Sequence, residues 1–197
     1  MSKHSIINPY RKAAALIYNR VKWDIKLESW NSRKKLQKIK DRNIGEKAVI
    51  LCNGPSLNKT DFSLLENVYT FGLNKINLLF NRSNFRPSCI VSVNPFVIKQ
   101  NSDFFNNTKI PLYIDSSGIK YINRKTNVCF LHSTAVRNFA KDCSYSIDQG
   151  YTVTYVALQL AFHMGFKEVA LIGCDHNFAT KRSEEHTSEL QSPSAIS

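Results

Sequence analysis

The chain has 197 residues, of which 43% are hydrophobic, and a formal net charge of +12. This length suffices for one sizeable core without a second domain, and no apolar run reaches the roughly 18 residues of a membrane span. The N-terminus lacks the apolar stretch of a secretory signal. The five cysteines are widely spaced and form no Cys-x-x-Cys pair. We therefore expect a cytoplasmic protein with buried thiols, not a disulfide framework or a zinc site.

Residues 1–45 carry most of the positive charge, with twelve Lys or Arg against three Asp or Glu. Between Tyr10 and Arg42 apolar residues such as Ile17 and Val21 recur at helical spacing, which predicts a basic amphipathic arm. Such an arm could dock on its own domain or on a partner. It could also lie on an anionic membrane, peripheral to the inner face. Docking is the favoured interpretation, membrane contact is the alternative, and specific nucleic-acid binding is not expected because charge is the only signal.

Strand and helix patterns alternate from Lys47 onward. Strands are expected at 48–52, 68–73, 89–93, 112–115, 128–131 and 169–173, and helices at 61–66, 76–80, 96–105, 135–141 and 153–165. Alternation of this kind is typical of a three-layer, Rossmann-like α/β fold with a mainly parallel sheet. We expect residues 46–181 to form one such domain.

Residues 182–197 resemble the translation of a DNA sequencing adapter. On this interpretation the segment is not native and is excluded from the site. The natural chain would then continue past Lys181, and the α/β domain would be truncated at its C-terminal end. A genuine polar tail is the alternative.

The first expected strand ends in Asn53, Gly54, Pro55 and Ser56. A buried strand that turns sharply into a helix points backbone N–H groups out of the sheet edge, where phosphates bind. A glycine lets a ligand approach the backbone, a proline fixes the turn, and a serine adds a hydroxyl. An ordinary strand-to-helix turn would look the same, so this loop alone leaves both interpretations open.

Asparagine also ends the second and third expected strands, at Asn74 and Asn94. Asn is a poor strand former, and its amide can both donate and accept hydrogen bonds, which suits a base, a ribose or a phosphate. Each Asn by itself could simply end its strand through an Asx turn. Three successive strand ends with Asn together favour a ligand site.

The last expected strand ends in Gly173 and Asp175. Asp175 is the only acid at these four strand ends, so it is a weak candidate for catalysis, although one carboxylate does not make a metal site. Gly150 and Thr152 precede the clearest helix, whose start could bind a second anion or could simply be capped by Thr152. The residues expected to bind the ligand are Asn53, Gly54, Pro55, Ser56, Asn74, Asn94, Gly150, Thr152, Gly173 and Asp175.

The order and spacing of these motifs resemble a known domain. They are Asn53-Gly54-Pro55-Ser56-Leu57, the two later strand-end Asn residues, Gly150-x-Thr152 and Val169-x-Leu171-Ile172-Gly173-x-Asp175. The domain is shared by archaeal 6-hydroxymethylpterin diphosphokinases and their bacterial MptE-like relatives. A more distant likeness is to bacterial sialyltransferases that use CMP-sialic acid.

The first resemblance implies a nucleotide-binding transferase that moves a diphosphate from ATP, with Mg²⁺, to a small hydroxyl acceptor. The second implies a CMP-sugar donor and a glycan acceptor, with a general-base histidine downstream of the matched region. A non-catalytic nucleotide-binding scaffold is the remaining alternative, because no general base, nucleophile or Lys-containing phosphate loop is visible.

Overall fold

Six strands form the central sheet of the structure, a computed structural model in which residues 8–175 are described. They are β1 (Lys47–Leu51), β2 (Tyr69–Leu73), β3 (Cys89–Ser92), β4 (Leu112–Asp115), β5 (Val128–Leu131) and β8 (Glu168–Ile172). Their order is β5-β4-β3-β2-β1-β8, and every neighbouring pair is parallel. The expected α/β fold is confirmed, and the ends of each strand lie within one residue of the expected positions. The 182–197 segment lies outside the described residues.

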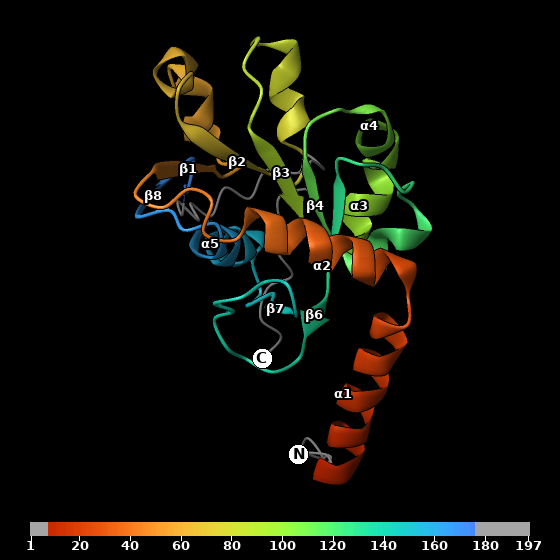
Figure 1. Ribbon diagram of the computed structural model, residues 1–197. Helices are drawn as coiled ribbons and strands as arrows, with labels where there is room; N and C mark the ends of the chain where they lie inside the picture. The colour runs from red at the N-terminus through yellow and green to blue at the C-terminus, as the bar shows by residue number, and fades with distance from the viewer. Residues whose placement is uncertain (1–7, 176–197) are drawn as a thin grey trace, which may run out of the picture.

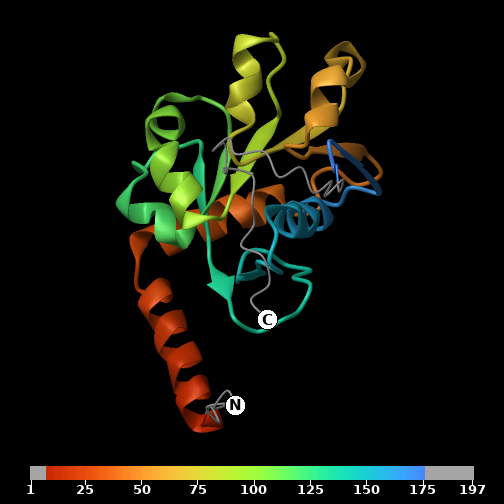
Figure 2. The same ribbon diagram turned by 180° about the vertical axis from the view of Figure 1, so that it is seen from behind.

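Helices cover both faces of the sheet, which gives the three layers (Figure 1). One face packs against α2 (Leu27–Ile39) and α5 (Val153–His163), in a buried cluster that includes Leu36, Phe71 and Leu160. The other face packs against α3 (Pro95–Gln100) and α4 (Ser102–Asn107), with Ile98 and Phe105 in its cluster. Figure 2 shows α3 and α4, in green, on the side opposite α2.

Four connections are short 3₁₀ helices, namely η1 (Pro55–Lys59), η2 (Phe62–Leu65), η3 (Ile76–Asn81) and η4 (Ser116–Lys120). The helices expected at 61–66 and 76–80 therefore exist, but as the tighter 3₁₀ type. The helix expected at 96–105 is broken at Asn101, where the backbone leaves helical angles (φ −105°, ψ 15°) between α3 and α4.

The helix expected at 135–141 was wrong. These residues belong to an irregular loop between two short strands, β6 (Ser133–Thr134) and β7 (Ile147–Asp148), which pair in parallel. The backbone of this loop forms a hydrogen bond to α5: the N–H of Ala140 donates to Gln159 Oε1 at 3.0 Å. The ring of Phe139 packs edge-on against Phe162, with ring centroids 5.6 Å apart. Tertiary partners from α5 thus replace the hydrogen bonds of a local helix.

The expected arm forms two helices, α1 (Pro9–Asp24) and α2, and α2 lies against the edge strand β5. The Ser32 hydroxyl accepts a hydrogen bond from the backbone N–H of Phe130 at 2.9 Å. The Lys35 ammonium donates to the carbonyl of Val128. An edge strand presents unpaired backbone groups, and α2 satisfies two of them. Docking onto the domain therefore describes α2, although the domain boundary at residue 45 stays a prediction.

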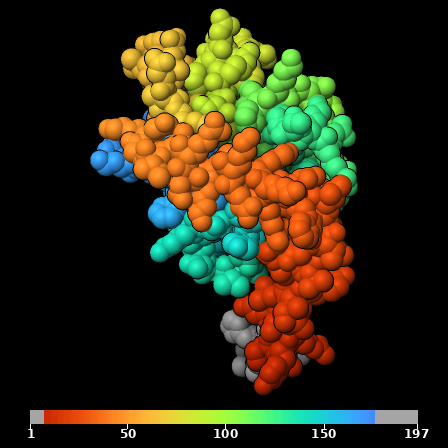
Figure 3. Space-filling view, in the orientation of Figure 1, coloured from red at the N-terminus to blue at the C-terminus, as the bar shows by residue number. Residues whose placement is uncertain are grey.

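The first helix, α1, extends away from the body of the molecule (Figure 3). Trp23 is its one buried residue. The apolar side chains on its outer side are exposed, among them Tyr10, Ile17, Tyr18 and Val21. Membrane-surface contact through residues 10–42 stays a prediction. Within residues 8–175, no helix combines the length and the apolar character that crossing a membrane would require.

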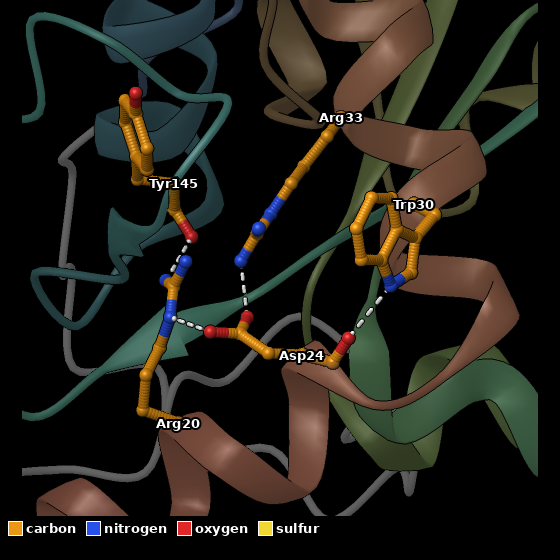
Figure 4. A network of polar contacts seen from close by, with 5 residues as sticks. All are labelled: Arg20, Asp24, Trp30, Arg33 and Tyr145. Atoms are coloured by element: carbon orange, nitrogen blue, oxygen red, sulfur yellow. Dashed lines mark hydrogen bonds and ion pairs between the residues drawn. The ribbon is translucent and has the colours of Figure 1, made fainter.

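A polar network around Asp24 joins α1 to α2 (Figure 4). The Asp24 carboxylate pairs with Arg20, at 2.8 Å, and with Arg33. The backbone carbonyl of Asp24 accepts from the Trp30 indole N–H at 2.9 Å. The guanidinium of Arg20 also donates to the carbonyl of Tyr145 at 2.6 Å, which ties α1 to the loop before β7. These bonds fix the angle at which α1 leaves the domain.

Candidate ligand site at the carboxyl edge of the sheet

All six strands are parallel, so their carboxyl ends lie along one edge of the sheet. The chain builds β1 to β5 outward in one direction and then returns to place β8 on the other side of β1. The topological switch point therefore lies between β1 and β8. In open α/β sheets, ligands bind in the crevice at such a point.

The ends of β1 and β8 are joined directly to each other. The backbone N–H of Gly54 donates to the carbonyl of Gly173 at 2.9 Å, and the N–H of Ser56 donates to the Asp175 carboxylate. Pro55 begins η1 between these two contacts. A backbone N–H group in the loop that was expected to bind a phosphate thus donates to a carboxylate of the protein itself.

Both glycines at this crossing are required by the close approach of the two segments. A Cβ on Gly54 would lie 2.4 Å from the carbonyl oxygen of Gly173. A Cβ on Gly173, whose φ of +72° already favours glycine, would lie 2.4 Å from the carbonyl oxygen of Cys52. Gly54 was interpreted as a place where a ligand nears the backbone; here the neighbouring strand end takes that space.

Asn53 and Asn74 join the ends of β1, β2 and β3. The side-chain amide of Asn53 donates to the carbonyl of Leu73 at 3.0 Å. Asn74 adopts a left-handed backbone (φ +49°), and its side-chain oxygen accepts from the Ser92 hydroxyl at 3.3 Å. Asn is one of the few residues besides glycine that adopts this conformation readily. Both residues are half-buried.

Asn94 caps the start of α3, and its side-chain oxygen accepts from the backbone N–H of Phe96 at 2.9 Å. The Asx-turn interpretation therefore describes this residue. Each of the three Asn side chains uses one half of its amide inside the protein. Among the described residues, the oxygen of Asn53 and the NH₂ groups of Asn74 and Asn94 have no hydrogen-bond partner. One acceptor and two donors thus remain at three adjacent strand ends.

The start of α5 lies beside the end of β1. Thr152 caps the helix by accepting from the N–H of Tyr155 at 3.2 Å, and Gly150 precedes it with a φ of +50°. In the first turn, the Thr154 hydroxyl lies 3.8 Å from the Cys52 thiol at the end of β1. The plain-cap interpretation accounts for Thr152. The positive end of the α5 dipole is nevertheless close to the switch point, where it favours an anion.

The Cys52 thiol at the switch point is a poor nucleophile. Cys52 and Cys174 lie side by side, with 2.8 Å between their sulfur atoms. Burial, with a further contribution from Cys174, raises the pKa of Cys52 to about 12, so the thiol is neutral at physiological pH. Within residues 8–175 no cluster of three or more His, Cys, Asp or Glu side chains could hold a metal ion.

The same edge carries a second polar group, at the ends of β4 and β5. Here a cavity of about 280 Å³ lies between the sheet edge and α1. Asp115, the last residue of β4, is 5% exposed, and its carboxylate accepts from the Ser133 hydroxyl, from Gln149 Nε2 at 3.1 Å and from the N–H of Ser117 at 2.8 Å. Gln149 also donates to the Ser133 hydroxyl at 2.7 Å.

His132 follows β5 and lines the same cavity, and its ring stacks on the ring of Trp23 from α1, with centroids 5.5 Å apart. Burial, reinforced by the nearby Arg20, lowers the pKa of His132 below its usual value. The imidazole is therefore neutral at pH 7, so one ring nitrogen can donate a hydrogen bond and the other can accept one.

Sequence analysis missed this second group. Asp115 ends the fourth expected strand, which was not among the four strand ends compared in the sequence. Asp175 is therefore not the only acid at this edge of the sheet. The strand-end rule itself would have found Asp115. Ser133, Gln149 and Trp23 carried no comparable signal, because they come from a two-residue strand, from the residue after β7 and from the arm.

The fold and this row of polar strand ends define a Rossmann-like α/β protein with a candidate ligand site along one sheet edge. The family model described as 6-hydroxymethylpterin diphosphokinase MptE-like matches residues 25–181. The chain belongs to this family. The match includes α2 and every strand of the sheet but begins after α1. A search of curated proteins found no match to the chain.

Proposed function

We propose that the chain binds a nucleotide along the carboxyl ends of β1, β2 and β3 and is a nucleotide-dependent transferase of the diphosphokinase type. The family supports a nucleotide-binding role. The observation that carries the proposal is the row of Asn53, Asn74 and Asn94, each with half of its amide unused by the protein. Adjacent strands lie about 4.8 Å apart, so the row spans roughly 10 Å, comparable with part of a nucleotide.

The phosphates would lie toward the switch point, between the 53–56 loop and the start of α5. Mg²⁺, bound through those phosphates, would neutralise their charge. In diphosphoryl transfer the acceptor hydroxyl oxygen forms a bond to the β-phosphorus, the bond from that phosphorus to the bridging oxygen of the α-phosphate breaks, and AMP leaves. The hydroxyl proton must pass to a base. Asp115 and Asp175 are two carboxylates at this edge.

Binding and transfer are tested separately. Thermal unfolding of the full chain is followed with ATP and Mg²⁺, with CTP, with CMP and with a CMP-sugar. A ligand present at 100 times its Kd stabilises the native state by about 2.7 kcal/mol, which is roughly 5–10 °C for a chain of this size. A shift with ATP and Mg²⁺ supports the proposal, and AMP release with an added hydroxyl acceptor supports transfer. A shift with cytidine nucleotides alone supports the CMP-sugar alternative, and binding without turnover supports the scaffold.

Asn74→Gly tests the row itself. Glycine keeps the left-handed backbone of Asn74 and removes the amide, so nucleotide affinity should fall about 5- to 150-fold, the equivalent of roughly 1–3 kcal/mol for a buried hydrogen bond. Asp41→Gly is the matched control, because Asp41 is also left-handed (φ +54°) but lies before β1, at the opposite edge of the sheet. Equal effects of the two variants, or none at Asn74, would argue against the row as the binding site.

The exposed side of α1 supports a further part of the proposal, contact with a membrane. Ile17 is 65% exposed and Val21 is 53% exposed, one turn apart on one side of the helix. Arg11, Lys12 and Lys22 lie on the same helix. An apolar stripe flanked by cations is the pattern of a helix that lies on an anionic bilayer surface. We propose this surface as the partner of α1.

A further inference from the structure

The geometry points to a second small-molecule site: we infer that the cavity between α1 and the ends of β4 and β5 binds a hydroxylated organic anion, such as a sugar phosphate or a sugar acid. Its volume of about 280 Å³ suits one small ligand. Neither the proposed nucleotide row nor any contact between β1 and β8 involves this cavity. The inference depends on its floor, its rim and its α1 wall.

The floor is built to bind hydroxyl groups. Asp115, Ser133 and Gln149 come from β4, β6 and the residue after β7, and they meet in one hydrogen-bonded group. All three line the cavity. The Ser133 proton and both Gln149 amide protons are used within this group, so the floor offers carboxylate, hydroxyl and amide oxygens as acceptors to a ligand that carries several hydroxyls. The neutral imidazole of His132 adds another group that can donate or accept.

The rim is positively charged. Lys22, in the last turn of α1, and Lys26, in the bend just before α2, both line the cavity, as does Asn19. Two ammonium groups at the mouth attract an anion, while the carboxylate of Asp115 lies at the floor. The ligand should therefore place its charged group at the rim and its hydroxyls inside, and this polarity is what distinguishes a sugar phosphate from either a neutral polyol or inorganic phosphate.

The α1 wall is held in place independently of any ligand. Trp23 is buried against His132, and Arg20 bonds both Asp24 and the carbonyl of Tyr145. The family match begins at residue 25, so Lys22 and Trp23 lie outside it. Lys26 lies inside the match, so the charged part of the cavity is supplied only in part by the matched domain.

The cavity continues the row of polar strand ends. β4 is the next strand after β3, so Asp115 lies about one strand spacing, roughly 4.8 Å, beyond the end that carries Asn94. With the phosphates at the switch point beside β1, the other end of the proposed nucleotide would lie nearer the cavity. Binding of the hydroxylated anion does not rest on the proposed function.

The test uses Trp23 as a reporter. Trp30→Phe in the full chain leaves Trp23 as the single tryptophan, since the chain has two. Its fluorescence is titrated with glucose 6-phosphate, gluconate, sorbitol and inorganic phosphate. We expect saturable binding of glucose 6-phosphate or gluconate, at least tenfold tighter than that of sorbitol or phosphate. Equal affinity for inorganic phosphate, or no saturable change with either hydroxylated anion, would overturn the inference.

Variants locate the binding. The double change Lys22→Gln and Lys26→Gln should weaken binding of the hydroxylated anion at least tenfold, whereas Lys34→Gln with Lys38→Gln, on α2 outside the cavity, should not. Ser133→Ala should reduce the preference for glucose 6-phosphate over phosphate. An anion that binds equally to all variants would place the site elsewhere. The thermal shift induced by the nucleotide is measured on the same rim variants. A shift that persists in variants that no longer bind the anion separates the two sites. A shift that is absent in every protein would count against the proposed function alone.

Discussion

The contact between α2 and the edge of the sheet predicts a specific cost for removing one hydroxyl. Ser32 is 3% exposed, and its hydroxyl is the hydrogen-bond partner of the Phe130 N–H on β5. In Ser32→Ala that buried N–H loses its acceptor. Leaving a buried donor unsatisfied costs about 1–3 kcal/mol. For a chain of this size the melting temperature should fall by roughly 2–12 °C.

Ser29 supplies the matched control on the same helix. It is 0% exposed, and its hydroxyl has no hydrogen-bond partner among the described residues. Ser29→Ala removes the same atom without depriving a backbone N–H of its acceptor. Both changes replace Ser by the better helix former Ala, which stabilises α2 by up to roughly 0.5 kcal/mol. Ser29→Ala should therefore be neutral or stabilising. The difference between the two variants isolates the hydrogen bond to β5.

Urea unfolding at several wavelengths gives the free energy of unfolding for both variants and the parent chain. The reasoning holds if Ser32→Ala is less stable than Ser29→Ala by about 1–3 kcal/mol with unchanged m-values. Equal stabilities of the two variants would refute it, because the Ser32 hydroxyl would then contribute nothing to satisfying the Phe130 N–H.

Three further predictions follow from other parts of the structure. Leu36→Ala, at a position 2% exposed between α2 and the sheet, should lower the free energy of unfolding by about 2–5 kcal/mol, whereas Leu64→Ala, at an exposed position, should change it by less than about 0.5 kcal/mol in urea unfolding. Burial alone would raise the pKa of Asp142, but hydrogen bonds from Lys40 and Ser144 outweigh it and lower that pKa to about 2. Because the folded pKa is depressed, the stability from this group should be present above the unfolded pKa near 4 and lost as the pH falls toward 2. Asp142→Asn should therefore make the free energy of unfolding less dependent on pH over that window. An unchanged pH profile in this variant would exclude the effect. Ile17→Asp combined with Val21→Asp should abolish co-sedimentation with phosphatidylglycerol vesicles without lowering the melting temperature, and retained sedimentation would exclude α1 as the membrane contact.

The strands could be predicted because each is a short apolar run bounded by polar or turn residues. Val91 and Ile114, for example, are fully buried in β3 and β4, as expected for a sheet covered on both faces. The irregular loop at 135–141 could not be predicted from a local pattern in the same way. Its backbone partner is Gln159, on a helix that comes later in the chain, so the local pattern held no trace of it.

The candidate site likewise has a part that the sequence predicts and a part that depends on tertiary structure. Asn53, Asn74 and Asn94 could be brought together from sequence, because parallel strands place successive carboxyl ends at one edge. The space around Gly54 could not, since it depends on where Gly173 crosses β1. The cavity near Asp115 required tertiary structure as well: its walls come from four segments, including α1, and their convergence leaves no sequence pattern.

The central claim is that the asparagine row binds a nucleotide. The most direct measurement is isothermal titration of the full chain with ATP and Mg²⁺, in the parent protein and in Asn74→Gly. We expect saturable binding to the parent chain and an affinity about 5- to 150-fold lower in the variant, because one buried hydrogen bond is lost. Unchanged affinity in a folded Asn74→Gly protein, or no nucleotide binding to the parent chain at all, would contradict it.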